Sequence, residues 1–423
     1  MKAAYITLGC KVNQYDTDAM RVIMEKNGFE TVNFDEIADV YIINTCSVTQ
    51  TSDKKSRQMI SRAHAKNARA CIVVSGCYAK LRRKEVEELD GVNIVLGTDD
   101  RADIFSRVSS YLNGVQEEKN EHGARFEDLT AHSYDRARAY LKIEDGCDRF
   151  CTYCVIPYAR GEIKSRSLQS VERELIRLSG MGYKEIVLTG IHIMSYGKDM
   201  CDGTNINDVI KMAGEIGIER IRLGSLEPEF CNENFVSAVR NANNVCAQFH
   251  LSLQSGSDST LKRMNRRYTT DGYRKAVRLL RKNIDDAAIT TDIIVGFAGE
   301  TEEEYRETLS FAEEIGFSRI HVFPYSRRSG TRAYDFPNQI LKSVKEERAR
   351  ELIALSHELS LKFNKNMLQK TAKVLFESEE NGIFHGYTEN YVEVFLKSNR
   401  DITGEILEVK LEQLYRDGIL GAC

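Results

Sequence analysis

Short apolar runs alternate with amphipathic, helix-like segments along most of the chain, and this alternation limits the fold more than any other feature. In residues 1–113 helical patterns separate the strand-like runs, which is typical of a parallel sheet covered by helices on both faces. We therefore predict an N-terminal α/β domain with a doubly wound parallel sheet. Its expected strands are Ala3–Leu8, Val40–Asn44, Cys71–Ser75 and Asn93–Leu96.

The alternation stops at residues 114–138, a charged stretch with His122 and Gly123 that we interpret as a linker. A second series of strand–helix units follows in residues 139–366 and ends in an amphipathic helix over about Leu341–Asn364. Eight such units close a full barrel, whereas six give an open, partial (β/α)6 barrel whose working face lies at the carboxyl ends of its strands. We predict six strands: Tyr140–Ile143, Glu185–Thr189, Arg220–Gly224, Phe249–Leu253, Ile289–Val295 and Arg319–Pro324.

Residues 367–423 contain short strand-like runs such as Ala372–Phe376 and Tyr391–Leu396, which predict a small C-terminal β-barrel. No apolar run approaches the ~20 residues that are needed to cross a bilayer. The first residues turn polar too soon for a signal peptide. We therefore expect a cytoplasmic protein without a membrane partner.

The chain has eleven cysteines, and clustered cysteines in a cytosolic protein more often hold metal than form disulfides. Cys147, Cys151 and Cys154 have CxxxCxxC spacing directly after the first predicted strand of the second region. Three thiolates can bind three irons of a four-iron cluster, which leaves one iron open to a cofactor or substrate. The alternative is structural zinc, but a closed zinc site needs four ligands and neither Cys nor His follows closely after Cys154.

Three further cysteines, Cys10, Cys46 and Cys77, each stand at the end of a predicted strand. The carboxyl ends of neighbouring parallel strands converge on one crevice, so these thiols can meet in space. Gly9 and Gly76 leave the backbone room to turn beside a bulky group. We favour a second cluster here over three core cysteines. The other cysteines fit small buried hydrophobic residues: Cys71, Cys201, Cys231, Cys246 and Cys423.

The loop Gly146–Cys154 resembles the signature of radical S-adenosylmethionine enzymes, and the six-unit count fits their partial barrel. The resemblance implies that the open iron chelates S-adenosylmethionine and that one electron cleaves it to a 5′-deoxyadenosyl radical. It also implies two cofactor-binding residues, Tyr153 against the adenine and Gln254. The family's Gly-Gly-Glu after the second strand is replaced by Thr189–His192, which lacks the acid and leaves the methionine contacts unassigned. We interpret His192 as either a rim histidine or a packed one.

The N-terminal cysteines resemble the second cluster site of methylthiotransferases, which handles the transferred sulfur, and residues 367–423 are similar to that family's RNA-gripping TRAM domain. The block Thr7–Gln14 and the run Glu185–His192 resemble the threonylcarbamoyladenosine branch, because the isopentenyladenosine branch usually has Gln-Met at Lys11-Val12. The resemblance implies radical methylthiolation of C2 of N6-threonylcarbamoyladenosine next to the anticodon (position 37) of tRNA. It also implies two 4Fe–4S clusters, S-adenosylmethionine, an external electron donor and a sulfur source.

The sequence leaves other functions open. The methylthiolated group is alternatively isopentenyladenosine in tRNA or an aspartate of a ribosomal protein. A non-catalytic iron–sulfur RNA-binding protein would carry the same cysteines. Formation of 5′-deoxyadenosine separates the enzymes from the binding protein, and a change in RNA mass separates tRNA from protein substrates.

The distribution of charge directs attention to the barrel. The net charge is −4, and residues 367–423 hold six basic against ten acidic residues, although phosphate affinity comes from lysine and arginine. The threonylcarbamoyl carboxylate also needs a cation, and arginine matches a carboxylate best. We predict that Arg327 or Arg328 meets this carboxylate, with phosphate or solvent contact as the alternative. The candidates for RNA or substrate contact are Lys262, Arg263, Arg266, Arg267, Arg327 and Arg328.

Overall fold

The computed structural model describes residues 1–115, 125–132 and 137–423. Its N-terminal part is a five-stranded parallel sheet in the order β2-β1-β3-β4-β5, as expected for a doubly wound fold. The strand order reverses between β1 and β3, and such a switch point opens a crevice at the carboxyl ends of the strands. The strands are β1 (Lys2–Thr7), β2 (Glu30–Val32), β3 (Val40–Thr45), β4 (Cys71–Gly76) and β5 (Val92–Val95).

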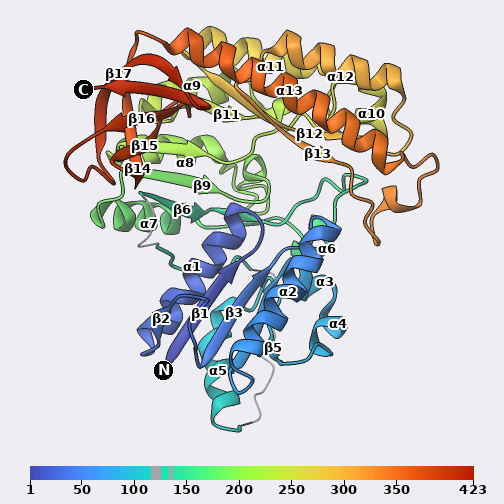
Figure 1. Cartoon of the computed structure of the whole chain (residues 1–423), viewed down its shortest axis with the longest axis vertical. Helices are drawn as coiled ribbons and strands as arrows, with labels where there is room; N and C mark the ends of the chain where they lie inside the picture. Colours follow the sequence, from blue (N-terminus) through green and yellow to red (C-terminus); the bar gives the residue numbers. More distant parts are fainter. Residues whose placement is uncertain (116–124, 133–136) are drawn as a thin grey trace.

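The central strands, β3 and β4, are buried along their whole length because helices cover both faces of this sheet. Apolar side chains from α1 and α5 pack on one face, and those from α2, α3 and α4 pack on the other. The sheet and helices lie at the bottom of Figure 1. The helices are α1 (Lys11–Lys26), α2 (Gln50–Lys66), α3 (Cys77–Leu81), α4 (Arg83–Glu87) and α5 (Ile104–Leu112).

Six parallel strands form the central region, so the predicted number is confirmed. They make two three-stranded sheets, β10-β9-β6 and β11-β12-β13, which isolated bridges join through Ile221–Val245 and Leu226–Leu251. Because β6 and β13 do not pair with each other, the barrel is open along one side. The strands are β6 (Arg138–Lys142), β9 (Glu185–Thr189), β10 (Arg220–Leu223), β11 (Gln248–His250), β12 (Ala288–Val295) and β13 (Arg319–Pro324).

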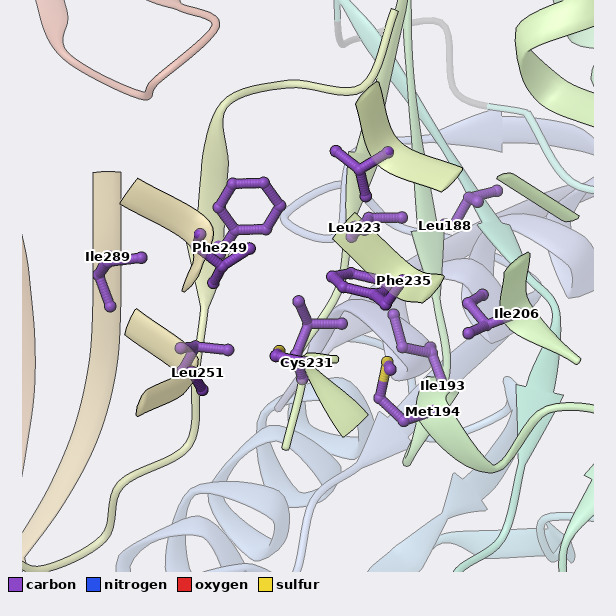
Figure 2. Close-up of a cluster of buried hydrophobic side chains, with 14 of the residues drawn as sticks. Leu188, Ile193, Met194, Ile206, Leu223, Cys231, Phe235, Phe249, Leu251 and Ile289 are labelled. Carbon is purple, nitrogen blue, oxygen red and sulfur yellow. The ribbon is translucent and has the colours of Figure 1, made fainter. Parts of the chain in front are cut away.

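The barrel strands present an apolar outer face and a polar inner face, as their period of two residues requires. Figure 2 shows the outer layer, where Leu188, Leu223 and Phe249 of the strands lie near Phe235 of a covering helix. A short hairpin, β7 (Glu144–Asp145) with β8 (Lys164–Ser165), follows β6. The helices are α6 (Ile156–Arg160), α7 (Leu168–Gly180), α8 (Ile206–Glu215), α9 (Glu233–Ala242), α10 (Asp258–Arg263), α11 (Thr270–Asn283), α12 (Glu302–Ile315) and α13 (Lys342–Met367).

The C-terminal strands form a closed barrel in the order β14-β15-β16-β18-β17, as predicted. Its interior is apolar, with Val374, Phe376 and Val394 fully buried. Arg220 and Arg222 of the central barrel donate to its backbone, to the carbonyl oxygens of Lys373 (2.7 Å) and Glu389 (3.1 Å), respectively. The strands are β14 (Thr371–Glu380), β15 (Ile383–Thr388), β16 (Glu393–Lys397), β17 (Ile406–Tyr415) and β18 (Gly418–Ala422).

The predicted linker is partly packed rather than free. Leu129 and Ala131 are buried in the core of the central barrel, and Arg101 donates to Glu127 (2.8 Å). The linker residues His122 and Gly123 lie outside the described residues. Among the described residues, no helix has the length and apolar character that a membrane span requires.

Candidate metal centres and active site

The central cysteines, Cys147, Cys151 and Cys154, lie in the loop between β7 and α6, at the carboxyl end of the barrel. The loop is tight: Cys154 N–H donates to the Cys151 carbonyl oxygen (3.0 Å), and Cys147 N–H donates to that of Gly161 (3.1 Å). Gly146 has φ 90°, and a Cβ there would overlap the Glu162 carbonyl. Burial and the neighbouring thiols raise the pKa of Cys147 and Cys154 to about 12. Metal binding deprotonates thiols, so this crowded donor set fits a cluster.

A buried arginine accompanies these cysteines. Arg266 Nη1 lies 3.2 Å from Cys151 Sγ, and Arg266 Nη2 lies 2.9 Å from Glu227 Oε1. Glu227 also faces Arg149 (2.9 Å) and His192 Nε2 (2.9 Å). Although burial opposes ionisation, the hydrogen bond to His192 and the charge of Arg266 lower the pKa of Glu227 to about 2. The carboxylate is therefore anionic beside the cysteine loop.

His192 is a packed histidine. Its backbone N–H donates to Glu144 Oε2 (2.7 Å), and its ring contacts Ser195 as well as Glu227. Burial holds the pKa of Glu144 well above its usual range. Glu144 and Glu227 thus place two carboxyl groups beside Thr189–His192. Both come from other segments of the chain, so sequence spacing alone did not reveal them.

The N-terminal cysteines come from three strand ends: Cys10 caps α1, Cys46 follows β3 and Cys77 begins α3. Burial raises the pKa of Cys77 to about 11; the charge of Arg160 opposes this rise, and the neighbouring thiols of Cys10 and Cys46 add to it. Gly9 has φ 110°, and a Cβ there would lie 2.9 Å from Cys46 Cβ. These converging thiols, with glycine where a side chain would collide, fit a second cluster.

Asn13 and Arg160, which sequence analysis missed, organise this second site. Asn13 Nδ2 donates to the carbonyl oxygens of Leu8 (2.8 Å) and Thr45 (3.0 Å), just before Gly9-Cys10 and Cys46. Arg160 Nη2 donates to Asn13 Oδ1 (2.6 Å), and the charge of Arg160 opposes the rise in the pKa of Cys77. Arg160 stands six residues after Cys154. Arg160 thus connects the central region with the second cysteine site, and its place directly after the cysteine motif is the only sequence signal for it.

A buried ionic network extends this junction. Asp16 of α1 accepts from Arg101 (2.8 Å) and Lys142 (2.7 Å), and Asp145 accepts from Lys142 (3.2 Å) and Arg160 (2.9 Å). The side chains of these five residues are each at most 9% exposed. Because a buried charge without a partner is costly, the network fixes α1 against the barrel.

The predicted cofactor residues lie on the same side of the barrel. Tyr153 is half-buried, with its ring centroid 6.3 Å from that of Phe297. Gln254 has φ 68°, in the left-handed region, and its N–H donates to the Asp292 carbonyl oxygen (2.8 Å). A non-glycine residue in this conformation is uncommon and is held by its surroundings.

The four basic candidates near α10 divide into two pairs. Arg263 is tied to Glu304 (2.7 Å), and Arg266 is the neighbour of Cys151 described above rather than an RNA contact. Lys262 and Arg267 are exposed. Only the exposed pair is available to a phosphate backbone.

The candidates after β13 face the N-terminal region. Arg328 is buried and donates to Asp53 (2.7 Å) and Ser47 (2.7 Å), so its guanidinium holds two regions of the chain together instead of meeting a substrate. Arg327 is exposed, donates to the Tyr334 carbonyl oxygen (2.7 Å) and stacks over its ring at 4.2 Å.

Lys11 is a further cation of the site. It begins α1 next to Cys10, is exposed, and its charge interacts with those of Arg138, Arg222, Glu185 and Asp292. The surrounding protein and the two arginines lower the pKa of Lys11 to about 8. Lys11 is thus an exposed cation whose charge acts on residues of β6, β9, β10 and β12.

Two family models match the chain: "Uncharacterized protein family UPF0004" at residues 2–97 and "Radical SAM superfamily" at residues 141–312. Among solved structures, the radical S-adenosylmethionine methyltransferase TsrM from Kitasatospora setae is similar, with a TM-score of 0.56 and 14% identity over 76% of this chain and 72% of that chain. At this identity the likeness concerns the fold alone.

Curated relatives match nearly the whole length. The threonylcarbamoyladenosine tRNA methylthiotransferase MtaB of Bacillus subtilis (strain 168) is 41% identical over 96% of this chain and 93% of its own. The tRNA-2-methylthio-N(6)-dimethylallyladenosine synthase of Pelotomaculum thermopropionicum is 33% identical over 96% and 94%. The chain therefore belongs to the radical S-adenosylmethionine methylthiotransferase family, whose enzymes use S-adenosylmethionine and 4Fe–4S clusters.

Proposed function

We propose that this chain methylthiolates C2 of N6-threonylcarbamoyladenosine beside the anticodon (position 37) of tRNA. The observation that carries the proposal is the presence of two separate three-cysteine sites, because radical formation and sulfur delivery each need a cluster. The branch is supported by the names of relatives at 33–41% identity that act on threonylcarbamoyladenosine in tRNA. Those named for dimethylallyladenosine are 33–34% identical.

The central site would bind the cluster that carries S-adenosylmethionine, with Cys147, Cys151 and Cys154 as ligands. When bound, the two clusters would carry the electron and the sulfur that external donors provide, and S-adenosylmethionine would supply the radical and the methyl group. Arg266 donates to Cys151 and would stabilise the negative charge of thiolate ligands. Tyr153 would lie against the adenine of the cofactor, and Gln254 would complete its pocket.

The second site would bind its cluster through Cys10, Cys46 and Cys77. Asn13 fixes the loops before Cys10 and Cys46, and Arg160 adds a positive charge beside Cys77. The target base lies in the anticodon loop, where bases can leave the stack without opening a duplex.

The remaining assignments complete the proposal. We assign residues 1–113 to the second cluster, 114–138 to the linker, 139–366 to the radical chemistry and 367–423 to a TRAM-like RNA-binding domain. Lys262, Arg267 and Arg327 are exposed and would contact phosphates. An external electron donor and a sulfur source are required, and the enzyme would work in the cytoplasm beside its tRNA.

The test is anaerobic reconstitution of both clusters, followed by incubation with S-adenosylmethionine, a reductant and tRNA that carries threonylcarbamoyladenosine. Mass spectrometry should find 5′-deoxyadenosine and a methylthiolated nucleoside. A Cys423→Ala variant is a matched control, since this exposed cysteine lies outside both sites. Production of 5′-deoxyadenosine with unchanged RNA would contradict the tRNA substrate.

A further inference from the structure

The inner face of β13 is open along the unpaired side of the barrel. Ile320 and Val322 point outward and pack into the core, whereas Arg319, His321 and Phe323 are exposed. Figure 1 shows β13 at the edge of the central region, away from β6. A substrate group that enters the barrel would therefore meet this strand.

Most cations that line the barrel interior are already paired. Arg222 lies 2.8 Å and Arg138 lies 3.4 Å from Glu185, and Arg220 also faces this carboxylate at 3.7 Å. Lys142 is bound to Asp16 at 2.7 Å. These four cations are therefore already paired: the three arginines face Glu185 of the barrel, and Lys142 binds Asp16 of α1.

Two cations on this interior, Lys11 and Arg319, have no such partner. Within residues 1–115, 125–132 and 137–423, neither side chain forms a hydrogen bond or an ion pair. Arg319 stands two residues before His321 on the inner face of β13, and the charges of both Arg319 and Lys11 lower the pKa of His321. Lys11 also interacts with Arg222, Arg138, Glu185 and Asp292, which belong to four different strands. Its charge is therefore felt by residues of four barrel strands.

The remaining groups of this wall are partly satisfied. Asp292 lies 3.4 Å from His250 Nε2, and His250 Nδ1 is 3.1 Å from Thr290 Oγ1. His321 stands beside His250 with ring centroids 6.0 Å apart. Two acids, Glu185 and Asp292, act on Lys11. Three arginines already surround Glu185, and Asp292 is paired with His250.

We propose that Lys11 and Arg319 bind the carboxylate of the threonylcarbamoyl group. The inference rests on the proposed function and names the residues that select its substrate. C2 and C6 both adjoin N1 of the adenine ring, so when C2 faces the two cysteine sites the N6 substituent extends to one side of them and carries its carboxylate toward the barrel wall. Burying that carboxylate without a partner would be costly. An ammonium and a guanidinium without partners are the groups that would meet it.

This assignment replaces the one predicted for Arg327 and Arg328. Arg328 is held by Asp53 and Ser47, and Arg327 lies on Tyr334. It also gives a role to Lys11, which directly follows the cluster ligand Cys10 and so connects the second site with the substrate's side group.

The experiment compares two anticodon stem-loop RNAs, one with threonylcarbamoyladenosine and one in which its carboxylate is a primary amide. Fluorescence anisotropy with the reconstituted enzyme and S-adenosylmethionine gives the ratio of the two dissociation constants. The wild-type enzyme should favour the carboxylate about 10- to 100-fold, as expected for charge-assisted hydrogen bonds. Lys11→Met and Arg319→Met should each lower this ratio, and the double variant should bring it close to one.

The controls separate charge from folding. Lys11→Arg should keep most of the preference, and Lys262→Met on the exposed face of α10 should leave the ratio unchanged because a phosphate contact affects both RNAs alike. Iron content shows whether each variant still binds both clusters. A preference that stays at the wild-type value in loaded Lys11→Met and Arg319→Met would overturn the inference.

The same enzyme preparations distinguish failure of this inference from failure of the proposed function. If the wild-type enzyme methylthiolates the threonylcarbamoyl RNA while the variants retain its preference, only the assignment of Lys11 and Arg319 falls. If the wild-type enzyme forms no methylthiolated nucleoside although it yields 5′-deoxyadenosine, the proposed function falls and the inference falls with it.

Discussion

The two cysteine sites are built in opposite ways. Cys147, Cys151 and Cys154 lie in one loop, whereas Cys10, Cys46 and Cys77 follow three different strands of a parallel sheet. Each site nevertheless has one buried arginine at its thiols, Arg266 in the first and Arg160 in the second. The first site draws its arginine from its own barrel. The arginine of the second site, Arg160, belongs to the central region, so the geometry of this site depends on how the N-terminal and central regions pack together.

The largest expected effect separates the two sites by their iron. Replacing Cys147, Cys151 and Cys154 together with Ala should remove about half of the iron and all cleavage of S-adenosylmethionine, because the ligands of one cluster are lost. Iron and sulfide analysis with quantification of 5′-deoxyadenosine measures this. Full retention of iron in this variant would show that these cysteines are not ligands.

Replacing either Arg160 or Arg266 should affect the cluster site beside which that arginine lies. Arg160→Met leaves Asp16 and Asp145 short of a buried partner, and we expect it to destabilise the protein by about 3 kcal/mol and to alter the second cluster. Arg266→Met should alter the first cluster instead. Urea unfolding of the apo-protein measures the loss of stability. Electron paramagnetic resonance reports on one cluster at a time when each arginine substitution is made in a protein that lacks the three cysteines of the other site. Identical spectral changes from both variants would contradict separate roles.

A smaller effect concerns the glycine loops of the second site. Gly76 has φ 94°, and a Cβ there would overlap Thr45 and Asn44, so Gly76→Ala should cost more than ~1 kcal/mol and reduce iron in the second site. Gly180→Ala is the matched control, because this glycine of α7 has open space and an ordinary φ. Thermal unfolding should show Gly180→Ala as neutral or stabilised by up to ~1 kcal/mol. Equal losses in both variants would argue against a special constraint at Gly76.

The smallest effect is expected at Arg327, one of two adjacent arginines that the structure treats differently. Arg327→Ala should change stability by less than ~0.5 kcal/mol, because its side chain is exposed. Arg328→Ala should be clearly destabilising, since it leaves Asp53 without its partner at 2.7 Å. Differential scanning calorimetry of the two variants tests this difference, and a neutral Arg328→Ala would remove its role between the two regions.

Sequence patterns predicted the strands well where apolar residues continued through the element. The ranges Glu185–Thr189 and Arg319–Pro324 coincide with β9 and β13. The edge strand β2 (Glu30–Val32) was missed because three residues, two of them polar, give too little periodicity. The linker was read from its charge, although Leu129 and Ala131 pack into the core.

The cysteines could be predicted because their chemistry is specific, but the charged residues could not. A run such as Arg266-Arg267 looks like a solvated surface, yet Arg266 is buried by its contacts with Cys151 and Glu227, which lie far away in sequence. Arg160 and Asn13 depend on the packing of two regions, and no local spacing encodes that. Tertiary pairing therefore decides which cations remain free for a substrate.

The most direct test of the account uses the variant in which Cys10, Cys46 and Cys77 are all replaced by Ala. After reconstitution, one reaction with S-adenosylmethionine, reductant and threonylcarbamoyladenosine-containing tRNA is analysed for both 5′-deoxyadenosine and the methylthiolated nucleoside. Division of labour between the sites predicts that this variant still forms 5′-deoxyadenosine and makes no methylthiolated nucleoside. Methylthiolation at the wild-type level would contradict it.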